Sequence, residues 1–493
     1  ARLPAGARLP GAAVRALVLP VLALLGAAAP AAPGAGRAAP CLHLERAGTE
    51  IRTDTRICPG RYRIADARER GVLIVAVSGT RLDLTGVVLE SGDSVPARFA
   101  GVGVLSRGVD SVTVLGGTIR GYRFGMRLEG GRGHEIRGSV LSNSRQHALL
   151  STDTLYDERD WLDIFRPDSA EAYGGGLLLR DVTGAIVTDV RAQRGQNGIL
   201  LHNVRRATIT DNDVSRNSGW GISLWRSSHN VIARNKASHN ARCVGRTYRR
   251  GCDSAALLLR EQSDSNVVAS NDLRYSGDGF FLSGHRPGLA PSNGNLVLRN
   301  DATGAYHNAF ESTFSWDNSF LDNRADSSDY GFWLGYSSGN TVRGNTIIGT
   351  RTAGIAIEHG SDHELSGNIV IGGGDGIRLF ARAENGPPSR GYRLYDNVLA
   401  RLSRGLVLER STQVKVRGNV FDGDEDGLVA DEASAGTEVA GNVFLRSTGF
   451  FIRAAELDAG ANYWGAESPE ATREKLAGRV LIAPWYPASA AGY

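Results

Sequence analysis

The chain has little of three residue types that many catalytic and metal sites need: lysine, methionine and cysteine. Of its 56 basic residues only Lys236, Lys415 and Lys475 are lysines, so cationic chemistry must be carried out almost entirely by arginine, which counts against a lysine base. A single methionine, Met126, and the lack of a dense histidine cluster leave few ligands for copper. The net charge of +4 is small and dispersed, so no nucleic-acid partner is expected.

Long apolar runs are also scarce. The N-terminal run from Ala16 to Leu25 is shorter than the roughly 18 residues of a membrane-spanning helix. It follows Arg15 and precedes small residues, which is the pattern of an export signal. We therefore expect residues 1–40 to be a signal peptide and linker, and the chain to be a periplasmic or secreted monomer that does not span a membrane.

The four cysteines fit an exported chain, where thiols are oxidised. We predict that Cys41 pairs with Cys58 in an N-terminal cap, and that Cys243 pairs with Cys252 to close a loop inserted into one repeat. A metal site is the competing interpretation, but no spacing here matches a CxxC pair.

What the sequence does contain is a phrase of about 22 residues, repeated at least eleven times. Each phrase opens with Gly or Ala, continues with apolar residues in alternation, and has an Asn near its end. The openings are Gly125, Gly176, Gly198, Gly221, Ala256, Gly279, Ala309, Gly331, Gly354, Gly376, Gly405 and Gly427. The asparagines are Asn212, Asn235, Asn271, Asn300, Asn323, Asn345, Asn368, Asn397, Asn419 and Asn442.

Alternation with period two indicates short strands, and apolar runs long enough for helices are missing between them. The pattern predicts an all-β fold, a single-stranded right-handed parallel β-helix over residues 71–465 with one repeat per coil. We expect a cap at residues 41–70 and a small cap at residues 466–493. The asparagines are expected to stack in one ladder along a turn, because a side-chain amide both donates and accepts hydrogen bonds.

Several phrases resemble the parallel β-helix repeat family, which has a pectin-lyase-like fold. The resemblance rests on Gly331 to Asn345 with its Ser337 to Asn340 turn, on Asn462 to Gly465, and on Pro484-Trp485. The family includes NosD-like periplasmic accessory proteins for copper-enzyme maturation as well as carbohydrate-binding and sugar-hydrolysis domains. It implies the fold, and it is shared by lyases, epimerases, hydrolases and non-enzymes.

One face of the predicted β-helix carries the candidate site. In each coil the third and fifth positions of the phrase are expected to point outward and the second and fourth to fill the core. The outward positions mix aromatic rings, carboxylates and arginines, with histidines just upstream, which is typical of a sugar-binding groove. The coils from Gly125, Gly221, Gly279 and Gly376 are longer than the others, and their inserts are predicted to wall a cleft along both edges of this face.

Glu311 is the predicted acid of this cleft. Its neighbours in the same column, Phe281 and Trp333, would raise the pKa of its carboxyl, as a general acid requires. The other predicted catalytic residues are His307, Asp278 and His285. The predicted substrate-binding residues are Arg260, Trp220, Trp225, Phe281, Trp333, Tyr336, Glu358 and Arg378, with Arg260 gripping a substrate carboxylate.

Each residue also has a structural interpretation. Asp278-Gly279 is a common turn pair, Glu311 is equally well a surface acid, and one of the two tryptophans, Trp220 or Trp225, could close the core against the disulfide loop. No cofactor and no metal are predicted. Calcium at the acidic insert from Asp157 to Asp163 stays an alternative, although the insert lacks EF-hand spacing.

Three classes of function remain. The first is an enzyme that acts on a polysaccharide or oligosaccharide by lyase, epimerase or hydrolase chemistry. The second is a NosD-like accessory protein for copper-enzyme maturation, and the third is a non-catalytic glycan-binding protein.

Overall fold

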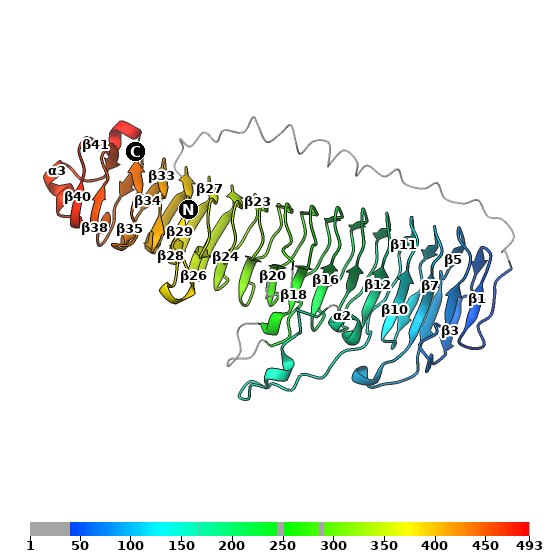
Figure 1. The fold of residues 1–493 in the computed structure, drawn as a ribbon. Helices are drawn as coiled ribbons and strands as arrows, with labels where there is room; N and C mark the ends of the chain where they lie inside the picture. Colours follow the sequence, from blue (N-terminus) through cyan, green and yellow to red (C-terminus); the bar gives the residue numbers. More distant parts are fainter. Residues whose placement is uncertain (1–39, 167, 244–250, 285–289, 493) are drawn as a thin grey trace.

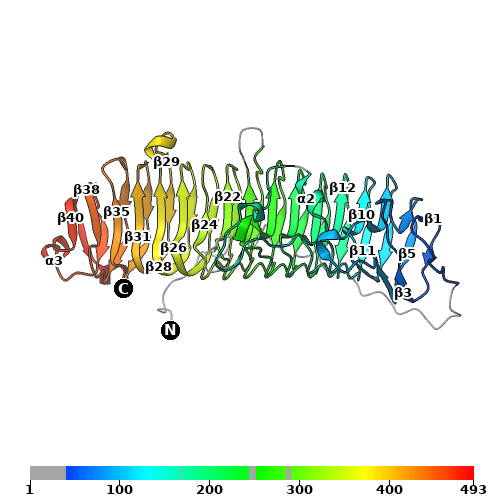
Figure 2. The ribbon, with the colours of Figure 1, turned by 90° about the horizontal axis from the view of Figure 1, so that it is seen from below.

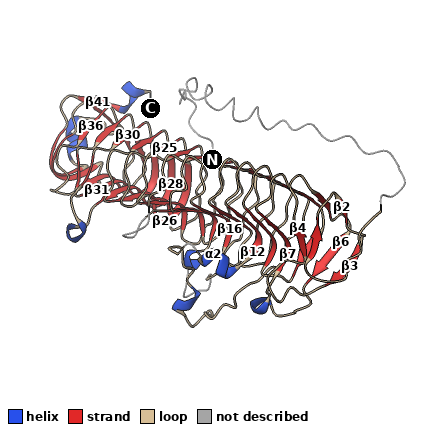
Figure 3. Cartoon of the chain, turned by 45° about the vertical axis from the view of Figure 1, so that its right-hand side comes forward, coloured by secondary structure: helices blue, strands red, loops and turns tan. Residues whose placement is uncertain are grey.

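The computed structural model describes residues 40–166, 168–243, 251–284 and 290–492. They form one long parallel β-helix, in which the chain winds in coils and each coil adds a strand to each of two long sheets (Figure 1). Strands make up the long faces, and the few short helices lie outside them (Figure 3). The predicted fold class is therefore confirmed.

The main sheet has 21 strands. They are β1 (Thr49–Ile51), β4 (Leu73–Val75), β7 (Val102–Arg107), β10 (Phe124–Glu129), β12 (Gly175–Arg180), β14 (Ile199–His202), β16 (Trp220–Trp225), β18 (Ala255–Arg260), β20 (Asp278–Ser283), β22 (Asn308–Thr313), β24 (Tyr330–Trp333), β26 (Thr346–Glu358), β28 (Ile369–Phe380), β31 (Val398–Glu409), β34 (Val420–Asp422), β35 (Asp426–Ala430), β37 (Val443–Leu445), β38 (Ile452–Asp458), β39 (Asn462–Trp464), β40 (Leu476–Leu481) and β41 (Trp485–Pro487).

The second sheet has 15 strands. They are β2 (Thr55–Arg56), β5 (Arg81–Asp83), β8 (Thr113–Leu115), β11 (Glu135–Arg137), β13 (Ile186–Thr188), β15 (Thr208–Thr210), β17 (Val231–Ala233), β19 (Val267–Ala269), β21 (Leu296–Leu298), β23 (Ser319–Leu321), β25 (Thr341–Arg343), β27 (Glu364–Ser366), β30 (Arg393–Tyr395), β33 (Lys415–Arg417) and β36 (Glu438–Ala440).

The remaining elements are short. Two small sheets contain β3 (Gly60–Arg63), β6 (Val87–Glu90) and β9 (Thr118–Arg120), and β29 (Ser389–Arg390) and β32 (Ser411–Thr412). The helices are α2 (Ser169–Tyr173), α3 (Pro469–Arg473), η1 (Pro96–Arg98), η2 (Glu158–Asp160), η3 (Gly251–Asp253), η4 (Ala383–Asn385) and η5 (Ala488–Ala491). In the described ranges no helix is both long and apolar enough to cross a membrane.

The register of the main sheet follows the repeated phrase. The second position of the phrase pairs from coil to coil, as in Ile222 with Leu257, Leu257 with Phe280, and Phe280 with Phe310. These side chains are fully buried in the core between the sheets. Because the side-chain period of a strand is two, this register turns the third and fifth positions to the outer face of the main sheet.

The predicted asparagine ladder is present and continues to Asn462. The backbone N–H of Asn323 donates to Oδ1 of Asn345 at 2.8 Å, and that of Asn345 donates to Oδ1 of Asn368 at 3.0 Å. The Nδ2 of Asn323 also donates to the carbonyl of Val297 in the preceding coil at 2.9 Å. Each buried amide thus satisfies backbone groups that the turn leaves without partners.

A second ladder, which we did not predict, lies at another turn. It contains Asn230, Asn266, Asn295, Asn318, Asn340 and finally His363. The imidazole of His363 takes the acceptor role of the amide, since its Nδ1 accepts the backbone N–H of Asn340 at 3.1 Å. Burial lowers the pKa of His363 to about 4, which keeps the ring neutral and able to accept this bond.

Both predicted disulfides, Cys41–Cys58 and Cys243–Cys252, are present. The first joins the start of the described chain to Cys58, two residues after the end of β2. The second closes the loop before β18, of which residues 244–250 lie outside the described residues.

The insert in the coil from Gly125, residues 143–174, corrects one expectation. It does not stand as a wall at the edge of the outer face but folds across it, over the strands around β12 to β20 (Figure 2). Leu162, Ile164 and Ala170 of the insert pack with Trp220 and other outward-facing side chains of the main sheet in a second hydrophobic cluster. This part of the outer face is therefore interior.

A buried ion pair fixes the insert to the disulfide loop. The guanidinium of Arg242 lies 3.0 Å from the carboxylate of Asp160, and both side chains are almost fully buried. The backbone N–H of Leu162 donates to the carbonyl of Cys252 at 3.2 Å. The insert and the loop thus form one covering layer.

Candidate functional site

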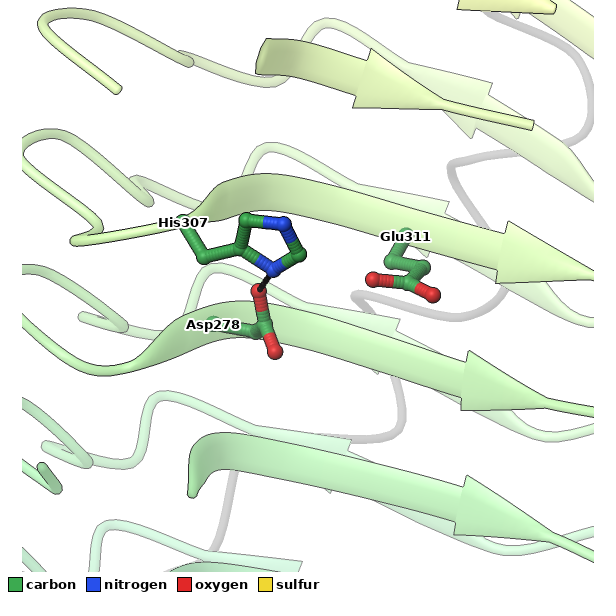
Figure 4. Close-up of side chains that lie close together, drawn as sticks. All are labelled: Asp278, His307 and Glu311. Atoms are coloured by element: carbon green, nitrogen blue, oxygen red, sulfur yellow. Dashed lines mark ion pairs between the residues drawn. The ribbon is translucent and has the colours of Figure 1, made fainter. Parts of the chain in front are cut away.

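Three of the predicted catalytic residues lie together on the outer face, just beyond the covering layer. Asp278 begins β20, His307 precedes β22, and Glu311 lies within β22 (Figure 4). The Nδ1 of His307 is 3.3 Å from Oδ1 of Asp278. One oxygen or nitrogen atom of each of the three side chains lies within 4.8 Å of the others. The coil register brings these residues together although 33 positions of chain separate the first from the last.

Asn308 connects these groups and was not among the predicted residues. Its backbone N–H donates to Oδ1 of Asp278 at 2.8 Å. Its Nδ2 donates to Oε2 of Glu311 in a short hydrogen bond and lies 3.2 Å from Nδ1 of His307. Strict register would have found it, since Asn308, not His307, occupies the column of Asp278.

The electrostatics of the cluster favour a protonated Glu311. Burial raises the pKa of its carboxyl, the negative charge of Asp278 raises it further, and His307 and the hydrogen bond from Asn308 oppose the shift. Phe281 and Trp333 pair with Glu311 on either side, as expected. Glu311 therefore carries its proton to a higher pH than an ordinary carboxyl.

A third carboxyl, Asp253, comes from the disulfide loop. Burial, reinforced by the charge of Asp278, raises the pKa of Asp253 to about 7, and His307 opposes this shift. The backbone carbonyl of Asp253 accepts a hydrogen bond from Nε1 of Trp220 at 2.9 Å, which fixes the loop against the sheet. The disulfide loop thus adds negative charge to the cluster.

Beyond Glu311 the outer face is aromatic, with Tyr330 and Trp333 partly exposed and Phe380 buried at 7% exposure. Trp333 is half-buried and meets Tyr330 edge-on at 4.9 Å between ring centroids, and Phe380 at 6.0 Å. A Cβ atom at Gly335 would lie 3.2 Å from Nε1 of Trp333, so the glycine leaves room for the indole. We call Tyr330, Trp333 and Phe380 the aromatic strip.

Arg260, Trp220 and Trp225 do not face solvent, contrary to prediction. Arg260 is 1% exposed and lies 4.5 Å from the ring of Trp220 and 4.9 Å from that of Trp225. It donates to the carbonyl of Ile164 in the insert at 3.1 Å, and burial lowers its pKa to about 9. The insert therefore keeps this arginine from a substrate, and the alternative interpretation of Trp220, closure against the disulfide loop, holds.

The other predicted binding residues have different surroundings. Phe281 is 5% exposed because it packs in the cluster under the insert. Tyr336 donates its hydroxyl to Glu358 at 3.0 Å, and Arg378 pairs with Glu409 at 2.8 Å. His285 lies outside the described residues.

The potential metal ligands of the described chain are few. Only one group of three or more His, Cys, Asp and Glu residues there has its ligand atoms close enough for one ion, and it is Asp278, His307 and Glu311. The four cysteines are in disulfides, and Met126 is fully buried in the core.

Comparisons with known proteins place the chain in a family. The family model described as periplasmic copper-binding protein (NosD) matches residues 89–286 and 245–473. No curated protein matches the sequence.

Solved structures resemble the chain only distantly. The Dettilon tailspike protein is 13% identical with a TM-score of 0.37, over 80% of this chain and 62% of that one. The periplasmic alginate epimerase AlgG is 13% identical with a TM-score of 0.35, over 80% and 77%. The family 28 exopolygalacturonase of Yersinia enterocolitica is 9% identical with a TM-score of 0.39, over 82% and 72%. At these identities the likenesses say nothing about this chain's activity.

Proposed function

The chain belongs to the periplasmic copper-binding protein (NosD) family, and within that family we propose that it is an exported β-helix protein that binds and processes a polysaccharide on its outer face. The reaction is proton transfer by Glu311 and by the His307–Asp278 pair. The observation that carries the proposal is the position of the half-buried Glu311 carboxyl. It has a raised pKa and lies between a histidine–carboxylate pair and the partly exposed rings of Tyr330 and Trp333.

Each residue has one role. Glu311, protonated at neutral pH, donates a proton to a substrate oxygen, and Asn308 orients its carboxyl. His307 accepts a proton, and Asp278 holds the imidazole by its Nδ1 so that the second ring nitrogen lies on the far side of the ring (Figure 4). Trp333 and Tyr330 offer apolar surface to the faces of sugar rings.

Two disulfides among the described residues support export, since such bonds persist in oxidising compartments. The family description also refers to the periplasm.

The residues present do not fit the copper of the family description. Copper(I) prefers thiolate and thioether ligands, whereas every cysteine here is in a disulfide and Met126 is buried in the core. The only candidate ligand group of the described residues has one imidazole and two carboxylates. Copper(II) is typically held by several nitrogen ligands, so we propose no copper chemistry for this site.

A screen of the purified protein against uronic-acid and neutral polysaccharides tests the proposal. Three products are measured together, because each reports one reaction: unsaturated ends for a lyase, new reducing ends for a hydrolase, and changed sugar configuration for an epimerase. We expect one of them with wild-type protein and none with Glu311→Gln, while the variant keeps its fold and its affinity for the polysaccharide.

Two results would contradict the proposal. Undiminished turnover by Glu311→Gln would remove Glu311 from the mechanism. A protein that binds polysaccharide and yields none of the three products would be a glycan-binding protein and not an enzyme.

A further inference from the structure

The carboxyl groups around His307 limit the chemical class of substrate that the site can bind. Asp253, Asp278 and Glu311 put three carboxyl groups around a single histidine. The pKa of Asp253 and that of Glu311 are both raised in part by the charge of Asp278, so the site already disfavours a second negative charge beside Asp278. A substrate carboxylate placed here would lie beside the charge of Asp278 and next to two carboxyls whose charged forms that charge already disfavours.

The arginines of the described residues near the site are buried or already paired. Arg351, which donates to the carbonyl of Tyr306 at 3.2 Å next to His307, pairs with Asp329. Between β18 and β31 the three outward columns that contain Asp278, Glu311 and Ser283 hold three arginines: Arg260, Arg378 and Arg404. Arg260 is buried between two tryptophans. Arg378 pairs with Glu409 at 2.8 Å and Arg404 with Asp375 at 2.7 Å.

The polar groups of the site suit hydroxyls better than a carboxylate. Asn308 is 1% exposed and its Oδ1 is buried without a hydrogen-bond partner, while its Nδ2 contacts Glu311. This oxygen carries partial negative charge, and because it is buried it adds that charge to the surroundings of the site without contacting a substrate itself. The aromatic strip beside it stacks on sugar rings of any charge.

We propose that the site takes a polysaccharide whose units carry no carboxylate, and that the reaction is hydrolysis. The inference rests on the proposed function and gives its substrate class. Elimination and C5 epimerisation both need a carboxylate next to the carbon that loses its proton, so a site that excludes carboxylates leaves hydrolysis among the three reactions.

The hydrolytic step balances with the groups present. Glu311 gives its proton to the glycosidic oxygen as the bond from that oxygen to the anomeric carbon breaks. A water molecule forms the new bond to that carbon and gives its proton to His307, whose imidazolium is stabilised by Asp278. Exchange of protons with solvent then restores protonated Glu311 and neutral His307.

Matched pairs of polymers that differ only in charge test the inference. Soluble neutral glucans and galactans are compared with their C6-oxidised derivatives, in which the C6 hydroxyl group is a carboxylate. Binding is measured by affinity electrophoresis and hydrolysis by new reducing ends. We expect the parent polymer to bind about tenfold better than its oxidised derivative at low salt, and the difference to shrink as salt screens the charges.

Asp253→Asn is the matched variant. It removes one carboxyl near the site and leaves Glu311 and His307 unchanged. The affinity of the parent polymer should therefore exceed that of its oxidised derivative by less than in the wild-type protein. Asp264→Asn, in the turn between β18 and β19, should leave the preference unchanged.

The outcomes separate this inference from the proposed function. An oxidised derivative or a natural polyuronate that is bound or processed as well as the neutral parent overturns the substrate class and leaves the proposed function standing. Failure to bind or process any polymer, neutral or charged, overturns the proposed function itself.

Discussion

The outer face of the main sheet holds two histidine–carboxylate pairs with the same spacing. His202 lies 3.3 Å from Glu171, and His307 lies 3.3 Å from Asp278. The first pair is at the edge of the covering layer, where Glu171 of α2 reaches the sheet, and the second is on the open side. Their side chains differ in access, because His202 is 9% exposed and His307 is 27% exposed.

The charges around the two pairs are opposite. Burial and then the positive charges of Arg260 and Arg180 lower the pKa of His202 to about 3, so its ring is neutral throughout the physiological range. His307 has Asp278, Glu311 and Asp253 beside it, all acids. The two pairs therefore differ in their surroundings although their distances are equal. His202 and Glu171 fix the insert to the sheet, whereas His307 and Asp278 have the acidic surroundings that we propose for proton transfer.

The largest expected effect is on turnover. It should appear when the His307–Asp278 pair is changed and not when the His202–Glu171 pair is changed. Asp278→Asn should lower kcat by about 100-fold or more, because His307 loses the partner that orients it and stabilises its charged form. Glu171→Gln should leave kcat unchanged. The pH dependence of kcat/KM is measured for both, since only a change at the base should move its acidic limb. Equal losses in the two variants would mean that the pairs act only in folding.

The next largest effect is on stability, and it concerns the part of the outer face that the insert covers. Asp160→Ala should lower the free energy of unfolding by about 3–5 kcal/mol, because it leaves the buried guanidinium of Arg242 without its partner. Urea denaturation measures the change, and limited proteolysis should detect a loosened insert. The exposed Asp168 supplies the control, Asp168→Ala, with a change within about 0.5 kcal/mol. Stability unaffected by Asp160→Ala would show that the insert is held by its apolar contacts.

Aromatic rings on the two sides should differ in glycan affinity. Trp333→Ala should weaken binding about tenfold, since it removes a half-exposed ring from the aromatic strip. Trp220→Phe should leave affinity unchanged and cost about 1 kcal/mol of stability, because it loses the hydrogen bond from Nε1 to Asp253. Isothermal titration with the polysaccharide checks the first and denaturation the second. An affinity lost in Trp220→Phe and kept in Trp333→Ala would reverse the assignment of the two sides.

The smallest effect is a pH dependence of stability on the open side. The folded chain raises the pKa of Glu311, so between the unfolded and folded values it keeps a proton that the unfolded chain has lost. The free energy of unfolding therefore falls as pH rises through this window, which begins at about pH 4. Glu311→Gln should flatten this slope, and Glu364→Gln on the second sheet should retain it. An unchanged slope in Glu311→Gln would show that its carboxyl is not buried as described.

Periodic features of the fold could be read from the sequence. The opening glycines fix the register, because a side-chain period of two and a coil of about 22 residues leave little freedom for slippage. That register was enough to place Asp278, His307 and Glu311 on adjacent coils, and to predict the ladder from Asn212 to Asn442. The roles of these residues in a reaction stay predictions.

Aperiodic features could not be read in this way. The path of residues 143–174 depends on contacts between distant parts of the chain, such as Arg260 with Ile164, and no local pattern signals them. Arg260, which we predicted to bind a substrate carboxylate, instead packs between the insert and the main sheet. Asn308 was missed although it directly precedes the opening Ala309, as Asp278 precedes Gly279, because the histidine one residue earlier offered the more familiar catalytic side chain.

The asparagine ladders join each coil only to its two neighbours, as Asn345 joins Asn323 to Asn368. A gene that duplicates or loses one whole coil after β24 would therefore still encode a closed ladder, with every amide bonded as before. The cluster at β20 and β22 would be untouched, and only the distance from it to the C-terminal cap would change. In such a lineage the length of the outer face on the C-terminal side of the cluster can evolve separately from the cluster itself, in steps of about 4.8 Å.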